Sequence, residues 1–343
     1  MKSLDKITDM AALKRLLEKQ NSGMSRTIDA VDMAAKLKER VKGQDHVVDD
    51  VSRFLKFQWA KEKRKRPIAN MMFLGPTGTG KTELCKGLAE YLYGDEKAML
   101  IFDCGDFSGP EGKSRLIGQP VGYVGSTQGG QLTRPMLNNP KRIVIFDEIE
   151  KAHPSIMDLF LSMMGDARLT EQGSGEAADF TQAIIILTSN AEQKALTQLQ
   201  KEMGDDEAAL INAIKSHLAS TNKFRPEILG RLDKIYVYNP LTQEIRLEII
   251  NLKMQTLAKE YGLVLEEVSP ELLLEALNRA DKVATFGARA LEQQLNDMFG
   301  EQFVLAKEGG GKHVRMVVAD DGKTPIIEPA VMGQGEVETS SRA

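Results

Sequence analysis

Residues Gly75 to Thr82 read Gly-Pro-Thr-Gly-Thr-Gly-Lys-Thr, a spacing suited to binding the phosphates of a nucleoside triphosphate. Glycines at such positions let successive backbone N–H groups surround an anion, and a following helix points its positive dipole end at the phosphates. Lys81 would reach the β- and γ-phosphates, and the Thr82 hydroxyl would bind Mg²⁺. The expected phosphate-binding residues are Gly75, Pro76, Thr77, Gly78, Thr79, Gly80, Lys81 and Thr82.

The residues around this segment have the pattern of a strand, a turn and a helix. The apolar run Met71–Leu74 precedes it, and Leu84, Leu88 and Leu92 follow at helical spacing. Gly94 stands where a helix C-terminus favours glycine. A plain glycine turn between strand and helix is the alternative, and this context disfavours it.

A second segment, Ile143 to Glu148, combines a buried strand with two carboxylates at its carboxyl end. In an open α/β sheet, ligands bind at that edge. Asp147 is suited to holding Mg²⁺, and Glu148 to polarising the water that attacks the γ-phosphate. Together with the phosphate loop, the pair predicts an ATPase that uses ATP and Mg²⁺.

Composition predicts a folded, soluble protein. The chain has 343 residues, 42% of them hydrophobic, which is enough for two domains. Its net charge of -4 gives no global footprint for nucleic acid, and we interpret the basic run Lys61–Arg66 as a solvated helix end or linker. Two cysteines cannot form a disulfide framework, and no signal peptide or membrane span is visible, so we expect a cytoplasmic protein.

The order of elements predicts an α/β fold in two parts. Near-continuous apolar runs, typical of a parallel sheet covered on both faces, alternate with helical segments. The expected strands are 71–74, 99–102, 142–146, 183–188 and 234–238. The expected domains are a helical N-terminal arm (1–40), a nucleotide-binding large domain (41–238), a small, mostly helical domain (239–328) and a disordered tail (329–343).

Several further motifs, in order along the chain, resemble those of the Clp-type AAA+ unfoldases, above all the second ATPase module of ClpA and ClpB. They are Ser114–Gly118, Gly122–Gly125, Gly129–Thr133, Asp147–Pro154 and Arg168–Thr170. The resemblance covers about residues 35–320. It implies a single AAA+ module with a parallel sheet flanked by helices and a C-terminal lid, working as a homo-oligomeric ring, expected to be hexameric, on protein substrates.

The resemblance also implies roles for residues to which residue type and spacing alone assign none. Asn190 matches sensor 1, which orients the attacking water, whereas by itself it reads as a turn residue. Arg231 matches the arginine finger that reaches a neighbouring subunit's γ-phosphate, and Arg289 matches sensor 2. Without the family, both arginines read as surface residues. Val41 is expected at the nucleotide.

Tyr123, followed by Val124 in a glycine-flanked loop, matches the family's pore loop, which grips an extended polypeptide. Packing against its own domain is the alternative for such an aromatic ring. A second pore loop, near residues 172–177, lacks the arginine that the family tends to carry.

Other positions depart from the family pattern. Lys42 stands where the family usually has an apolar residue against the adenine, and residues 104–107 read Cys-Gly-Asp-Phe in place of Met-Ser-Glu-Tyr. No Ile-Gly-Leu or Ile-Gly-Phe tripeptide lies between Asn190 and Phe224, so peptidase docking is disfavoured.

Three hypotheses follow. The first is an ATP-driven ring that unfolds, threads or remodels proteins without an attached peptidase. The second is an ATP-dependent assembly or scaffold protein that oligomerises for a partner without threading. The third, a nucleic-acid motor or loader, is supported only by residues 61–66.

Overall fold

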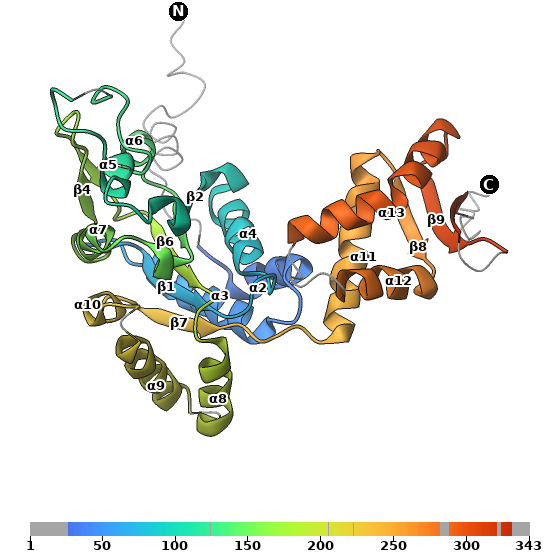
Figure 1. Ribbon diagram of the computed structural model, residues 1–343, viewed down its shortest axis with the longest axis horizontal. Coiled ribbons are helices and arrows are strands. Elements are labelled where there is room, and N and C mark those ends of the chain that lie inside the picture. The colour runs from blue at the N-terminus through green and yellow to red at the C-terminus, as the bar shows by residue number, and fades with distance from the viewer. Residues whose placement is uncertain are drawn as a thin grey trace, which may run out of the picture. The chain divides into compact units, whose positions relative to one another are not determined.

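The computed structural model describes residues 27–123, 125–204, 206–221, 223–281, 288–320 and 324–330 (Figure 1). The chain divides into two compact units, whose main sequence boundary falls between Asn239 and Pro240. The first unit holds the acidic strand end and the two ends of the phosphate loop, up to Pro76 and from Gly80 onward.

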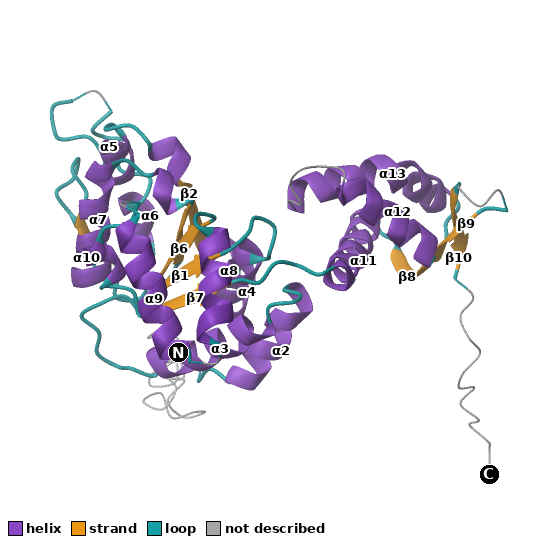
Figure 2. Ribbon diagram, turned by 60° about the horizontal axis from the view of Figure 1, so that its bottom comes forward, coloured by secondary structure: helices purple, strands orange, loops and turns teal. Residues whose placement is uncertain are grey.

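A parallel sheet forms the centre of the first unit, with helices on both sides of it (Figure 2). Its strands run in the order β2-β3-β6-β1-β7, and every neighbouring pair is parallel. The strands are β1 (Ala69–Leu74), β2 (Met99–Asp103), β3 (Ile143–Asp147), β6 (Ile184–Ser189) and β7 (Lys234–Val237). A separate antiparallel hairpin joins β4 (Arg168–Thr170) to β5 (Ala177–Asp179).

Two helices of this unit precede β1, and the others lie between strands along the chain. The helices are α2 (Ala30–Arg40), α3 (Asp45–Trp59), α4 (Lys81–Tyr93), α5 (Gly112–Ile117), α6 (Thr133–Asn138), α7 (Pro154–Asp166), α8 (Gln193–Met203), α9 (Glu207–Ser220) and α10 (Pro226–Leu229). Short 3₁₀ turns are η2 (Glu96–Ala98), η3 (Cys104–Phe107) and η4 (Ile149–Lys151).

Alternate residues of each central strand face two separate cores, which explains the near-continuous apolar runs. In β1, Met71 and Phe73 pack with α2, α3 and α4. Met72 and Leu74 join the other core, with α5, α7 and α9. The five strands expected from the sequence are all present, with ends that differ by one or two residues, and the parallel α/β fold is confirmed.

Helix α2 lies within the segment for which the sequence suggested an arm. Met33 and Leu37 are buried in the core shared with α3 and α4, so this helix packs into the first unit. Residues 1–26 lie outside the described part, as do residues 331–343 of the expected tail.

The second unit packs three helices against a small sheet. The helices are α11 (Gln243–Glu260), α12 (Pro270–Asp281) and α13 (Ala288–Glu308). The sheet has the order β10-β9-β8, with β8 (Val264–Val268), β9 (His313–Val318) and β10 (Pro325–Pro329). The helices agree with the mostly helical character expected for residues 239–328, whereas β8 and β10 were not among the expected strands. A pair of glutamates interrupts β8, and prolines bound the edge strand β10, so neither has a clear strand pattern.

Candidate nucleotide site

The phosphate loop joins the carboxyl end of β1 to the first residue of α4. Gly75 has a φ of 140°, and a Cβ atom there would lie 2.7 Å from the Tyr238 carbonyl oxygen. Only glycine fits a position that combines this backbone conformation with so close an approach. Val41 is buried, and its Cγ1 lies 3.1 Å from the position that a Cβ at Gly80 would take. The geometry therefore places Val41 beside the loop.

Lys81 is buried and anchored by three acceptors. Its Nζ donates to the carbonyl oxygens of Gly75 at 2.7 Å and Pro76 at 2.8 Å, and to Oδ1 of Asn190 at 2.7 Å. Burial lowers the pKa of Lys81 to about 8, although nearby carboxylates favour the charged form. The ammonium thus lies at the inner end of the loop, where phosphate oxygens can replace the carbonyl acceptors.

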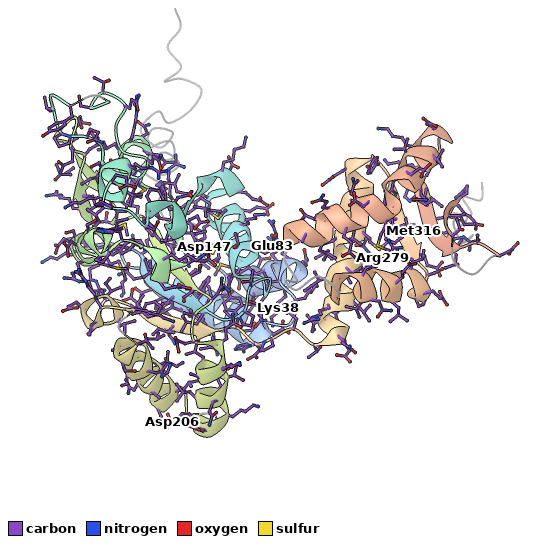
Figure 3. All side chains as sticks on the ribbon, viewed as in Figure 1. Lys38, Glu83, Asp147, Asp206, Arg279 and Met316 are labelled. Atoms are coloured by element: carbon purple, nitrogen blue, oxygen red, sulfur yellow. The ribbon has the colours of Figure 1, made fainter. Side chains whose placement is uncertain are left out.

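Asp147, labelled in Figure 3, ends β3, and Glu148 follows it. Because β3, β6 and β1 are successive parallel neighbours, both residues lie at the sheet edge from which the phosphate loop leaves β1. The Thr188 hydroxyl, at the end of β6, donates to Oδ1 of Asp147 and accepts the Glu148 N–H at 3.3 Å. Glu148 has a φ of 54°, a strained conformation for a residue with a side chain. Strain of this kind is often found at functional sites.

Asn190 connects the lysine to the glutamate. While its Oδ1 accepts from Lys81, its Nδ2 donates to Oε1 of Glu148 at 2.9 Å. The other carboxylate oxygen of Glu148 pairs with Lys151. Lys151, and then Asn190, hold the pKa of Glu148 below its ordinary value, against the effect of burial. Lys81, Asn190 and Glu148 therefore form one hydrogen-bonded chain with an ionised carboxylate at its end.

Thr82 and Asp147 offer the hydroxyl and carboxylate oxygens that Mg²⁺ prefers. Thr82 is exposed in the first turn of α4, and Asp147 is half-buried and held by Thr188. Within the described residues, no cluster of three or more His, Cys, Asp or Glu side chains could hold a metal ion. Two protein ligands fit Mg²⁺, which commonly takes its other ligands from phosphates and water.

Arg231 lies at the other end of the strands, by their amino ends. It precedes β7, whose Lys234 pairs with Met71 in the parallel strand β1, so it lies by the amino end of β1. Its carbonyl oxygen accepts from Arg66 at 2.7 Å, and its guanidinium lies against Gly165. The phosphate loop follows the carboxyl end of β1, so Arg231 does not approach Lys81 of its own chain.

Arg289 falls within the first turn of α13, but its side chain is outside the described part. Tyr123 is 68% exposed, on a loop whose turns are closed by hydrogen bonds from Tyr123 N to Pro120 O and from Ser126 N to Tyr123 O. Val124 lies outside the described residues. The exposed ring shows that Tyr123 does not pack into its own domain.

Sequence reasoning did not single out Thr188 or Lys151 as parts of the site. Both lie in segments that it named, the expected strand 183–188 and the motif 147–154. Their contribution depends on hydrogen-bond geometry across neighbouring strands, which spacing along one strand does not show.

The central part of the chain, residues 66–235, matches the family model of the AAA domain (Cdc48 subfamily). The probable chaperone protein ClpB 1 of Chlorobaculum tepidum is 36% identical over 298 residues, which cover 84% of this chain and 67% of that protein. The chain belongs to the Clp family of AAA proteins. The match also identifies it as an ATPase.

Other Clp proteins match over a smaller share of their length. The ClpB chaperone of Corynebacterium efficiens is 36% identical over 89% of this chain, but over 33% of its own length. The chloroplastic ClpC chaperone of Pisum sativum is 36% identical over 85% of this chain and 33% of its own. The chain thus spans about one third of these two Clp proteins. Among the described residues, no helix has the length and apolar character needed to cross a membrane.

Proposed function

We propose that this Clp-family chain forms a homo-oligomeric ring, expected to be hexameric, that couples ATP hydrolysis to unfolding, threading or remodelling of protein substrates. The proposal rests on one observation: Lys81 follows the carboxyl end of β1, whereas Arg231 lies by the amino end of the same strand. An arginine at that amino end can complete a phosphate site only on a neighbouring copy, and a closed ring gives every copy such a neighbour.

In this proposal, the loop from Gly75 to Thr82 binds the phosphates, with Val41 beside the base. Mg²⁺, held by Thr82 and Asp147, would neutralise phosphate charge. Glu148 accepts a proton from the attacking water, and Asn190 orients that water.

Two arginines complete the proposed site. Arg231 of the neighbouring copy stabilises the charge that develops on the γ-phosphate, and Arg289 contacts the phosphates of its own copy.

Tyr123 supports the choice of a polypeptide substrate. Its ring is 68% exposed and Val121, two residues earlier, is 76% exposed, so the loop presents apolar area to solvent. A tyrosine ring contacts many sequences because it combines an apolar face with a polar tip. The ClpB and ClpC relatives described above are named as chaperones, which fits a protein substrate. Since no Ile-Gly-Leu or Ile-Gly-Phe tripeptide lies between residues 190 and 224, we propose that no peptidase docks there.

The test is stimulation of ATP hydrolysis by an unfolded protein such as casein, measured with Tyr123→Ala and with Tyr123→Phe as the matched control. We expect the ratio of stimulated to unstimulated rates to fall to near one in Tyr123→Ala, because the ring that grips the chain is lost. The phenylalanine variant keeps the ring and should keep most of the stimulation. Full stimulation in Tyr123→Ala would contradict threading through this loop and favour an assembly role.

A further inference from the structure

Two loops of the first unit lie against each other. The Tyr123 loop, residues 118–130, connects α5 to the segment before α6, and the hairpin turn, residues 171–176, connects β4 to β5. Gln131 N donates to Arg115 O at 2.9 Å and Leu132 N to Leu116 O at 3.0 Å, which closes the base of the Tyr123 loop. The base is therefore fixed, although the tip carries an exposed aromatic ring.

Glu171 is a buried carboxylate between these loops, with 3% of its surface exposed. Its Oε2 accepts the backbone N–H of Ser174 at 2.6 Å. Burial alone would raise the pKa of Glu171, but backbone N–H groups of Ser174, Gly173 and Gly130 hold it below its ordinary value. The carboxylate is thus ionised, and its printed hydrogen bond comes from the hairpin turn. Its other oxygen, Oε1, is buried without a hydrogen-bond partner among the described residues and lies against Gly118 of the Tyr123 loop.

The backbones themselves also meet. Gln172 N donates to Ile117 O at 2.8 Å, just before the Tyr123 loop begins. A Cβ atom at Gly118 would lie 2.0 Å from Oε1 of Glu171, and one at Gly173 would lie 2.1 Å from the Ser126 carbonyl oxygen. Side chains at these glycines would not fit. The two glycines therefore allow the two loops to approach each other closely.

We propose that Glu171 is a positioning residue that clamps the base of the Tyr123 loop to the hairpin turn, so that the two loops move as one body. The effect of this clamp on the binding of a protein substrate rests on the proposed function. The hairpin turn then acts as a brace for the Tyr123 loop.

Tryptophan fluorescence can test the clamp directly, because the chain has a single tryptophan, Trp59. In a Trp59→Phe background, Tyr123→Trp places the only tryptophan on the loop tip. Glu171→Gln keeps the size of the side chain but removes its charge and one acceptor oxygen, so an amide donor must lie either against the Ser174 N–H or against Gly118 of the Tyr123 loop. The matched control is Glu176→Gln, an exposed carboxylate on the same turn.

We expect Glu171→Gln to lower the fluorescence anisotropy of the tryptophan introduced on the loop tip, whereas Glu176→Gln leaves it unchanged. Glu171→Asp keeps the charge with a shorter reach and should give an intermediate value. If Glu171→Gln does not fold, the aspartate variant decides the question against the same control. Anisotropy equal to that of the control in folded protein would overturn the clamp.

A second readout, in chains that keep Tyr123, separates the clamp from the proposed function. Glu171→Gln should raise the concentration of unfolded substrate needed for half-maximal stimulation of ATP hydrolysis about threefold to tenfold, since an unbraced loop loses preorganisation. A drop in anisotropy without this change would uphold the clamp and contradict substrate gripping by Tyr123. An unchanged anisotropy would reject the clamp, whatever the substrate assay shows.

Discussion

At the scale of single residues, Glu148 is held between Lys151 and Asn190 with its carboxylate ionised. A base that is ionised and fixed in direction needs no rearrangement before it polarises water. The same Asn190 amide also accepts a hydrogen bond from Lys81. If Lys81 moves onto phosphate, Asn190 loses this bond, and its contact with Glu148 changes as a result.

Replacing the proposed base gives a direct test at this scale. Glu148→Gln should lower the rate of phosphate release about 10²- to 10⁴-fold, the usual contribution of a general base, and should still bind ATP. The matched control, Lys151→Gln, keeps the carboxylate and should remain far more active. Turnover of Glu148→Gln at the normal rate would reject the assignment of the base.

The pKa of Lys81 gives a second test. With its pKa at about 8, the free lysine is charged below that pH and loses its proton as the pH rises through it. Because phosphate binds the charged form, ATP affinity should fall above about pH 8, by at most about tenfold per pH unit. Binding of a non-hydrolysable ATP analogue to the unchanged protein, measured from about pH 6.5 to 9.5, checks this. Lys81→Arg stays charged and should bind weakly but without this pH dependence; a flat profile with Lys81 in place would contradict the prediction.

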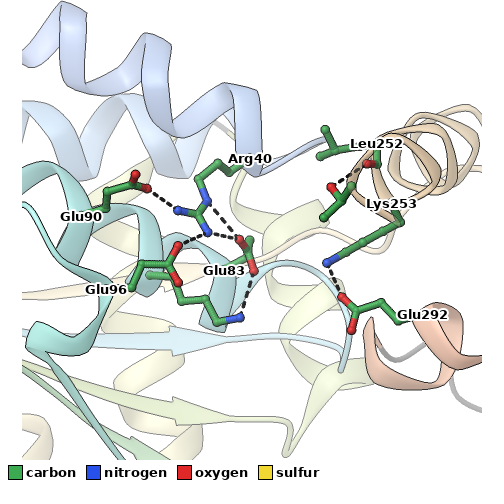
Figure 4. A network of polar contacts seen from close by, with 9 residues as sticks. Arg40, Glu83, Glu90, Glu96, Leu252, Lys253 and Glu292 are labelled. Atoms are coloured by element: carbon green, nitrogen blue, oxygen red, sulfur yellow. Dashed lines mark hydrogen bonds and ion pairs between the residues drawn. The ribbon is translucent and has the colours of Figure 1, made fainter. Parts of the chain in front are cut away.

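At the scale of elements, an ion cluster joins α2 to α4, the helix that begins at the phosphate loop (Figure 4). Nη2 of Arg40 lies 2.7 Å from Oε1 of both Glu83 and Glu96, and the same guanidinium pairs with Glu90. Burial opposes the charge, but hydrogen bonds from Arg40 to Glu96 and Glu83 raise the pKa of the guanidinium. The cluster therefore links the segment around Val41 to the helix that holds Lys81.

Removing this arginine should destabilise the first unit. Arg40→Gln leaves three carboxylates near one another without their cation, so we expect it to lower the free energy of unfolding by about 1–2 kcal/mol. Arg53→Gln, which breaks an exposed pair with Asp50, should change it by less than about 0.5 kcal/mol. Urea unfolding of both variants measures the difference. Equal stabilities would mean that the cluster contributes no more than a surface pair.

The elements that the sequence predicted are those with strong apolar patterns. Strands such as 184–189 are apolar through most of their length because both faces are covered, and this pattern is visible without a structure. The hairpin strands β4 and β5 have three residues each, too few for a pattern, so the contact between the hairpin turn and the Tyr123 loop was not predicted. Asn190 was found only through family resemblance, since its two partners come from distant parts of the chain.

At the scale of the whole molecule, the central claim is that each ATP site is shared between two copies. Arg231 is separated from the phosphate loop of its own chain by the length of β1. A ring is the arrangement in which every copy both receives and supplies such an arginine.

Mixing two inactive variants tests the shared site most directly. Arg231→Ala has an intact phosphate loop but no arginine for its neighbour, and Glu148→Gln has the arginine but no base. In equal mixtures that assemble at random, about one quarter of interfaces pair an intact site with an intact arginine. We predict that ATP hydrolysis rises well above that of either variant alone. Mixtures that co-assemble but hydrolyse no more ATP than the separate variants would contradict a site shared between subunits.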